Sequence, residues 1–230
     1  MLELLHTKVK SVEQSLVIIK PDGTVRRRIG ALVVKALLDR GYRTRAFREM
    51  KVSRDVAELH YAVHKEKPFF PWLVDFISSG HVLVMILEGD DVIQGVRDAL
   101  GATFVQKAEP DSLRGKYGIW AGINIAHASD GQDTARDEIA LWTNEGGVHF
   151  SDDAGQRAQE YIQKYDIGNA DYTMEIRDIV KSAIESKNTS PQVLESIKIL
   201  LGKDAEGIEN EGINELAVAI FDFIKEEAAK

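Results

Sequence analysis

His127 is the residue of this chain with the clearest capacity for chemistry. It lies in the segment from Gly122 to Asp130, where small and apolar residues typical of a strand lead into a helix start. A neutral imidazole, with an unperturbed pKa of about 6.5, is a nucleophile near neutral pH that needs no separate base. Glu138 falls on the helix predicted to follow, so its carboxylate could orient the ring. The alternative is that His127 ends a strand and Glu138 is a solvated helix charge.

A second segment joins an apolar strand to a turn. Leu16 to Ile19 is a short apolar run, and the Lys20-Pro21-Asp22-Gly23 that follows is typical of a turn in which Gly23 takes a positive φ. A lysine in such a place is more often a solvated charge than a ligand. The turn by itself therefore says nothing of the role of Lys20.

Two further segments hold groups that a phosphorylated histidine would require. The segment from His60 to Pro71 joins polar side chains to a pair of phenylalanines between two prolines. Phe69 could stack on a nucleobase, a contact worth about 1 to 3 kcal/mol per base, or both phenylalanines could be core residues. Further along lie Arg97, Thr103 and Arg114, and arginine is suited to bidentate contacts with phosphate.

Taken in order, these segments are similar to the nucleoside diphosphate kinase family, which moves a terminal phosphate between nucleotides through a phosphohistidine. The resemblance runs from about residue 15 to residue 142 without an insertion. A lone histidine motif would be weak, but many positions match. They are Lys20-Pro21-Asp22-Gly23, His60-Tyr61, Pro68-Phe69-Phe70, Glu88-Gly89, Arg97, Ser112-Leu113-Arg114-Gly115, Asn124, His127-Ala128-Ser129-Asp130 and Glu138-Ile139-Ala140-Leu141-Trp142.

The resemblance implies a role for each matching residue. His127 would be the phosphorylated nucleophile, with Glu138 bonded to its other ring nitrogen and Ser129 supporting that pair. The other implied contacts are Tyr61 at the catalytic centre, Phe69 on the base, Lys20 and Asn124 at the sugar and phosphate ends, and Arg97, Thr103 and Arg114 on the phosphates. Mg²⁺ would enter with the nucleotide, held largely by its phosphates. No metal site built from protein side chains is therefore expected.

Two residues of these segments have alternative interpretations. Ser129 and Gln132 have the spacing of a helix capping box, which an inactive protein would also keep. His64 lies near Tyr61 in the sequence and is either a further phosphate neighbour or a surface histidine. Because the base would be stacked and not bonded at its edges, we expect broad specificity among bases.

The chain departs from the family pattern at three places. Phe104-Val105 stands where the family usually has Asn-Pro, in a loop that helps subunits meet. The expected homo-oligomer would therefore use a different contact surface if Phe104 is exposed. Ile123 replaces a usual arginine. Ala128 replaces a usual glycine, which would cost about 1 to 2 kcal/mol if that position requires a positive φ.

Composition agrees with an enzyme of this kind. The 230 residues are 44% hydrophobic and 29% charged, enough to bury a sizeable core. The absence of cysteine excludes a disulfide framework and thiolate chemistry. No apolar stretch approaches the length of a membrane span, and the charges among the first fifteen residues are unlike a signal peptide. We therefore expect a cytoplasmic protein with no membrane partner.

Charge divides the chain near residue 150. Residues 1–150 hold 20 Lys and Arg against 20 Asp and Glu, whereas residues 151–230 hold 9 against 17, so the net charge of −8 lies in the second part. Apolar residues at helical spacing there predict about four helices, near 153–165, 172–186, 191–202 and 212–228. We therefore expect a nucleoside diphosphate kinase-like catalytic domain over 1–150 and a small, acidic, all-α domain over 151–230.

Nothing in this extension looks catalytic, and the resemblance does not cover it. The acidic run from Asp204 to Glu215 invites comparison with a calcium loop, but Ile208 and Glu209 stand where such a loop needs a ligand and a glycine. Packing on the catalytic domain, oligomerisation and docking of a protein partner are the open alternatives. The acidity of the extension argues against a nucleic-acid partner.

The first part of the chain has the pattern of an α/β protein. Strands are predicted at 16–19, 45–52, 82–87 and 118–122, and helices at 29–40, 53–64, 91–100 and 132–142. Two strand-helix-strand units of this kind suit a four-stranded antiparallel sheet with helices on one face. The resemblance implies the same α+β arrangement, the ferredoxin-like fold.

Two functions of different class remain. The first is a nucleoside diphosphate kinase that transfers the terminal phosphate of a nucleoside triphosphate such as ATP to a nucleoside diphosphate, by a ping-pong mechanism through His127. The second is a weak or inactive nucleotide-binding scaffold whose helical tail docks a partner. An inactive site would not need to keep its chemical residues, so the enzyme is favoured by the ten that this chain retains. They are Lys20, Tyr61, Phe69, Arg97, Thr103, Arg114, Asn124, His127, Ser129 and Glu138. Phosphorylation of proteins through the same His127 is also open.

Overall fold

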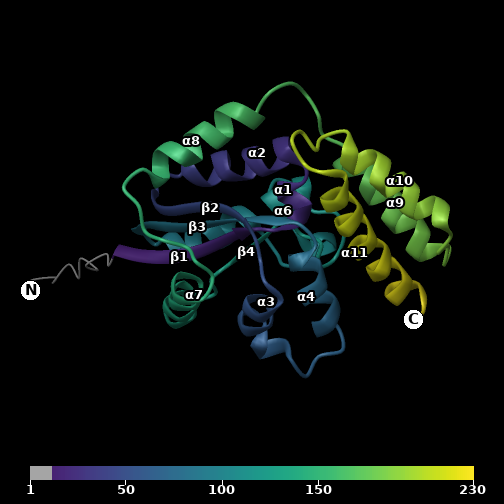
Figure 1. Ribbon diagram of the computed structural model, residues 1–230, viewed down its shortest axis with the longest axis horizontal. Coiled ribbons are helices and arrows are strands. Elements are labelled where there is room, and N and C mark those ends of the chain that lie inside the picture. Colours follow the sequence, from purple (N-terminus) through teal and green to yellow (C-terminus); the bar gives the residue numbers. More distant parts are fainter. Residues whose placement is uncertain (1–11) are drawn as a thin grey trace, which may run out of the picture.

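A four-stranded sheet lies at the centre of the computed structural model, which describes residues 12–230 (Figure 1). Its strands are β1 (Val12–Ile19), β2 (Arg43–Lys51), β3 (His81–Asp90) and β4 (Ala126–Ala128). Their order is β2-β3-β1-β4, and each neighbouring pair is antiparallel. The predicted ferredoxin-like sheet is thereby confirmed, with β1 and β3 in the centre and the short β4 at an edge.

Helices cover both faces of this sheet. One face packs against α3 (Arg54–His60), α4 (Phe70–Ser78) and α7 (Gln132–Asn144), and the other against α2 (Arg27–Leu38), α5 (Val92–Leu100) and α8 (Ala154–Tyr165). The expectation of helices on one face was wrong. The reason lies in β1, where Leu16 and Ile18 enter one core while Val17 and Ile19 enter the other. A strand that is apolar on both sides needs a layer on each.

The strand predicted at 118–122 does not form. Only an isolated bridge between Trp120 and Ile123 is present there, because Ala121 takes a positive φ of 45° and folds the chain back on itself. The fourth strand comes later, at Ala126–Ala128, and pairs with β1 so that His127 faces Ile18 across the ladder. The apolar run before the histidine therefore forms a buried loop, and the histidine itself is in the strand.

The segment after β1 is also not the turn that its sequence suggested. Pro21–Thr24 forms one helical turn, α1, and Gly23 has no positive φ. Glycine is needed there for space, since a Cβ would lie 2.6 Å from Cγ2 of Ile19 and 3.2 Å from the carbonyl oxygen of Ile125. Gly23 is thus required because α1 packs closely against β1 and the loop before His127, and not because of a positive φ as we expected.

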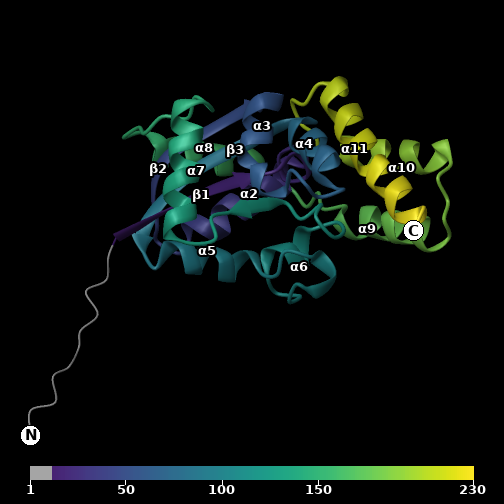
Figure 2. The same cartoon turned by 90° about the horizontal axis from the view of Figure 1, so that it is seen from below.

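The acidic extension is helical, as predicted. Besides α8 it contains α9 (Thr173–Glu185), α10 (Pro191–Gly202) and α11 (Asn210–Ala228), and these three pack together at one end of the sheet beside α4 (Figures 1 and 2). By contrast, α8 lies on the sheet itself, with the rings of Phe47 and Tyr161 5.7 Å apart. The division of the chain at residue 150 stays a prediction.

Three short elements complete the fold. They are α6 (Leu113–Tyr117) and two 3₁₀ turns, η1 (Ala62–His64) and η2 (Val105–Lys107). Within residues 12–230, no helix has the combination of length and apolar character that crossing a membrane requires.

The packing of Gly23 yields a stability prediction. Gly23→Ala would force its methyl group into Ile19, which is fully buried, and we expect a loss of about 1 to 3 kcal/mol in the free energy of unfolding. Gly155→Ala is the control, since Gly155 lies in helix α8 and a Cβ there meets nothing within 4 Å. That variant should match or exceed wild-type stability. Urea denaturation measures both, and equal midpoints for the two variants would contradict the packing role of Gly23.

Candidate active site

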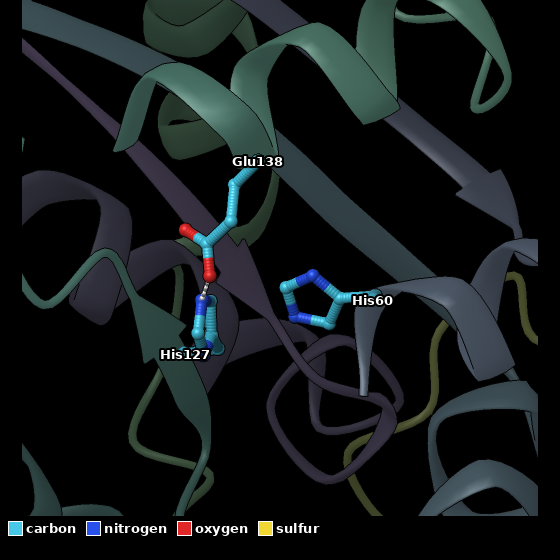
Figure 3. Close-up of side chains that lie close together, drawn as sticks. All are labelled: His60, His127 and Glu138. Carbon is cyan, nitrogen blue, oxygen red and sulfur yellow. Dashed lines mark hydrogen bonds and ion pairs between the residues drawn. The ribbon is translucent and has the colours of Figure 1, made fainter. Parts of the chain in front are cut away.

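A carboxylate on helix α7 fixes the orientation of His127 (Figure 3). Oε1 of Glu138 lies 2.8 Å from Nε2 of His127, and Oε2 accepts a hydrogen bond of 2.6 Å from the hydroxyl of Ser129. Because a carboxylate can only accept, Nε2 carries the ring proton and Nδ1 keeps the lone pair. The His127 side chain is 22% exposed. The imidazole is therefore held in the tautomer of a nucleophile and remains accessible.

Ser129 acts on this pair and is not a helix cap. Its oxygen also accepts a bond of 3.1 Å from the backbone N–H of Leu16, which ties it to the central strand β1. Helix α7 has Gly131 as its N-cap residue with no side-chain cap, and the amide of Gln132 bonds instead to Glu13. The capping-box interpretation was wrong, because the Ser129 hydroxyl is already committed to Glu138.

The strain near the histidine lies at Ile125 and not at Ala128. Ala128 has no positive φ, so the expected cost of replacing a glycine does not arise. Ile125 does have a positive φ, 67°, which is rare for a β-branched residue. Its N–H donates to Oδ2 of Asp22 over 2.8 Å, and its carbonyl accepts from the N–H of Lys20 over 2.8 Å. Helix α1 and its flanking residue thus hold the strained backbone that places His127.

His60 is a site residue that the sequence reasoning left out. Its ring lies against His127 with centroids 4.5 Å apart (Figure 3), and its Nδ1 accepts a bond of 3.3 Å from the indole of Trp142. Burial holds the pKa of His60 well below its usual range, with His127 and Lys20 adding to the effect. His60 is therefore neutral, and its Nε2 has no partner among the described residues. The sequence signal that could have identified His60 was its position next to Tyr61 in the same motif.

Lys20, Asn124 and Thr103 border the site and are linked by hydrogen bonds. The ammonium of Lys20 donates to Oδ1 of Asn124 over 2.8 Å, and the amide of Asn124 donates to the carbonyl of Thr103 over 2.7 Å. Burial, opposed by the charge of Asp22 and assisted by that of Arg114, lowers the pKa of Lys20 to about 8. The ammonium is held away from water and bonds to no carboxylate within residues 12–230, so it can accommodate an anion.

Two arginines also border the site. Arg114 is buried on α6 and donates to the carbonyls of Gly101 and Ala126, each over 2.8 Å. Burial lowers its pKa to about 10, and the charge of Arg97 adds to the shift. Arg97, in the last turn of α5, is half exposed and pairs with Asp130. The two like charges lie close enough to interact, and both arginines and Asp130 border the same cavity.

Aromatic side chains from the segment after α3 complete the site. Tyr61 is buried, its hydroxyl has no partner among the described residues, and burial raises its pKa, so it stays a neutral donor. The ring of His64 lies between Tyr61 and Phe69, with centroid distances of 6.5 and 5.6 Å. Phe69 is 45% exposed. It is thus a free aromatic face and not a core residue.

Most of these side chains border one cavity of about 1760 Å³. Of the ten predicted site residues, only Ser129 does not line it, since it is buried behind Glu138. The others are Lys20, Tyr61, Phe69, Arg97, Thr103, Arg114, Asn124, His127 and Glu138. The structure therefore brings together the residues that the sequence analysis selected.

Two departures from the family pattern differ in their position relative to this cavity. Phe104 borders the cavity and is 54% exposed, while Val105 beside it is buried. Ile123 is fully buried in the apolar core and places no charge in the site.

The comparisons agree with this geometry. The family model described as nucleoside diphosphate kinase matches residues 13–159. The chain belongs to the nucleoside diphosphate kinase family. The nucleoside diphosphate kinase of Microcystis aeruginosa is 45% identical over 131 residues, which are 57% of this chain and 87% of that one. The enzyme of Prochlorococcus marinus is 46% identical over 133 residues, 58% of this chain and 87% of its own.

Solved structures show the same family likeness. A nucleoside diphosphate kinase of Halobacterium salinarum, determined in complex with CDP, superposes with a TM-score of 0.56 at 36% identity, over 64% of this chain and 99% of that one. The nucleoside diphosphate kinase of Aquifex aeolicus gives a TM-score of 0.54 at 36% identity, over 57% of this chain and 94% of that one. The activity of this family member is phosphoryl transfer between nucleotides, and nothing in the described residues favours the scaffold alternative.

The bond between Glu138 and His127 can be tested directly. Glu138→Gln keeps the shape of the side chain but removes the charge that fixes the ring, and we expect phosphorylation of the protein by ATP to slow about 100-fold. Ser129→Ala should slow it about tenfold, since it removes one bond to a charged group. Glu145→Gln, the same exchange at the exposed C-terminal end of α7, serves as the control. Wild-type rates in Glu138→Gln would exclude the orienting role.

Proposed function

We propose that His127 is the nucleophile of a ping-pong phosphoryl transfer and that the cavity around it holds the nucleotide. The observation that carries this proposal is the bond of Glu138 to Nε2, which leaves Nδ1 free to attack. In the first half-reaction a bond forms between Nδ1 and the terminal phosphorus while the bond from that phosphorus to the leaving diphosphate oxygen breaks. In the second, a terminal oxygen of another nucleoside diphosphate takes the phosphoryl group and restores the imidazole.

The remaining site residues would neutralise and position the nucleotide. The transferring phosphoryl group spreads its charge over equatorial oxygens, so catalysis depends on fixed positive groups aligned with the line of attack. Lys20, Arg97 and Arg114 are those groups in our proposal, with hydrogen-bonding support from Thr103 and Asn124. The hydroxyl of Tyr61 would donate near the reacting phosphate, and Phe69 would stack on the base. Stacking without edge contacts would give broad base specificity.

The reaction of this family uses a divalent cation, and we propose that it is Mg²⁺ carried by the nucleotide phosphates. Among the described residues, the one cluster of potential metal ligands is His60, His127 and Glu138, with donor atoms within 4.8 Å of one another. Two imidazoles and one carboxylate suit a transition metal, whereas Mg²⁺ prefers oxygen ligands and retains water. The cation would supply charge neutralisation on the phosphates, and the protein side chains the positioning.

We further propose that the chain forms a homo-oligomer. The support is the exposed ring of Phe104, which offers apolar surface for a contact different from the one that the family's usual Asn-Pro would make. Light scattering of the full chain measures the number of subunits.

The phosphohistidine intermediate is the first thing to test. Brief exposure to ATP and Mg²⁺ at neutral to alkaline pH should add one phosphoryl group to the intact mass, and His127→Ala should remain unmodified. A chase with a different nucleoside diphosphate should discharge the adduct into the new triphosphate. An adduct that persists in His127→Ala, or that the chase does not remove, would contradict the proposal.

The burial of Lys20 predicts a pH dependence of nucleotide binding. A lysine whose pKa lies at about 8 loses its proton as the pH rises from 7 to 9, whereas phosphate groups are already ionised over that range because their second pKa is about 6. We therefore expect the affinity for ADP to fall across this interval as the ammonium is lost. Lys20→Met should bind ADP more weakly at pH 7 but with a flat profile. Calorimetric titration measures both, and an equal slope in the variant would assign the pH dependence to another group.

A further inference from the structure

The end of the C-terminal extension reaches the cavity of the candidate active site. Residues of the last two turns of α11 and the two that follow line the cavity together with Phe69, Leu73 and His127. They are Phe223, Glu226, Glu227, Ala229 and Lys230. The match to the family model ends at residue 159. This wall of the cavity is therefore an addition of this chain to the part that it shares with its relatives.

Trp72 joins this wall to the segment that carries the aromatic site residues. Its indole N–H donates over 2.8 Å to the carbonyl of Ala219 on α11, and its ring lies 5.0 Å from that of Phe223. Trp72 also stacks on Phe76, one turn further along α4. Both Trp72 and Phe223 are buried. Helix α11 thus fixes α4 directly after Phe69, and the two helices lie side by side in Figures 1 and 2.

The same extension is bonded to the other side of the cavity. The guanidinium of Arg177 on α9 donates to the carbonyl of Gly115, within α6, and to that of Gly118, its C-cap residue. The distances are 3.0 Å from Nη2 to Gly115 and 3.2 Å from Nε to Gly118. Helix α6 carries Arg114. The bundle of α9, α10 and α11 is therefore held both against α4, which follows Phe69, and against α6, which carries Arg114. These contacts fix the position of α11.

We propose that residues 223–230 are a wall of the nucleotide pocket and determine the affinity of this chain for nucleoside di- and triphosphates. The inference rests on the proposed function, in which the cavity holds the nucleotide. Phe223 favours binding by holding Trp72 and α4 in place. Glu226 opposes it, because this exposed carboxylate borders the cavity and bonds to no cation in the described residues. Glu227 is paired with Lys230 and contributes little net charge.

The role of Phe223 is tested against a matched residue of the same helix. Phe221 has the same side chain and similar burial, 9% against 7% exposed, but does not line the cavity. Alanine at either position should lower the melting temperature to a similar extent. In assays well below both melting temperatures, we expect Phe223→Ala to raise the KM for ADP about tenfold with kcat within about twofold, and Phe221→Ala to leave both within about twofold.

A surface variant tests the wall without disturbing the core. Glu226→Lys changes the net charge by the same amount as Glu195→Lys, an exposed position on α10 that does not line the cavity. If Glu226 faces the bound polyanion, its replacement should lower the dissociation constant for ADP several-fold at low ionic strength, and the gain should shrink as salt is added. The control should change the constant by less than about twofold.

Phe69→Ala, measured alongside, separates this inference from the proposal on which it rests. A higher KM in Phe69→Ala together with the changes expected for Phe223 and Glu226 supports the wall. A higher KM in Phe69→Ala, with both α11 variants equal to their controls, overturns the wall and leaves the nucleotide site in place. If Phe69→Ala also binds ADP as the wild type does, the nucleotide does not occupy this cavity, and both proposals are overturned.

Discussion

A single carboxylate that reaches from one layer of the fold to another is the contact on which the site depends. Glu138 lies on helix α7 and His127 on the edge strand β4, so their bond forms only if the helix packs on the sheet at one height and one rotation. Trp142, one turn further along α7, is fully buried and secures that packing. The apolar core thereby sets the tautomer of His127, and the tautomer decides which ring nitrogen keeps the lone pair that our proposed mechanism uses.

Near this pair the protein buries two positively charged side chains, Lys20 and Arg114, although burial disfavours a charged group. Burial lowers the pKa values of Lys20 and Arg114, which means that folding stabilises their charged forms less than water does. Their hydrogen bonds go to neutral acceptors, the amide of Asn124 and backbone carbonyls, so no carboxylate has to be displaced. A polyanionic ligand would repay this cost when it binds, which couples affinity to the charge of the ligand.

The extension is part of the same construction and not a loosely attached tail. The guanidinium of Arg26 is almost fully buried and bonds to the carbonyls of Asp22 and Tyr117 and to the hydroxyl of Thr173 at the start of α9. Asp22 in turn holds the backbone of Ile125, two residues before His127. Helix α9 and the loop before His127 are thus connected through one buried side chain. A change in the packing of the extension would therefore alter the position of the backbone before His127.

The sequence by itself determined the identities of the chemical groups and most of the elements that carry them. The motif positions selected ten site residues, and apolar periodicity predicted the central strands and the four helices after residue 150, because these patterns reflect local geometry. It could not place the fourth strand, since Gly118 to Gly122 is as apolar as a strand and only the positive φ of Ala121 turns it into a loop. Nor could it show that Gly23 serves packing.

Other features were decided by tertiary structure alone. His60 becomes part of the site only because α3 brings its ring against His127 and Trp142, residues 67 and 82 positions away along the chain. The wall at Phe223 arises because α11 packs on α4, which no local pattern encodes. Apolar spacing tells that a helix has a face to bury, but which surface covers it depends on the shapes of all the elements together. The sequence thus identifies the chemical groups of the site, and tertiary packing decides which residues from distant parts of the chain lie beside them.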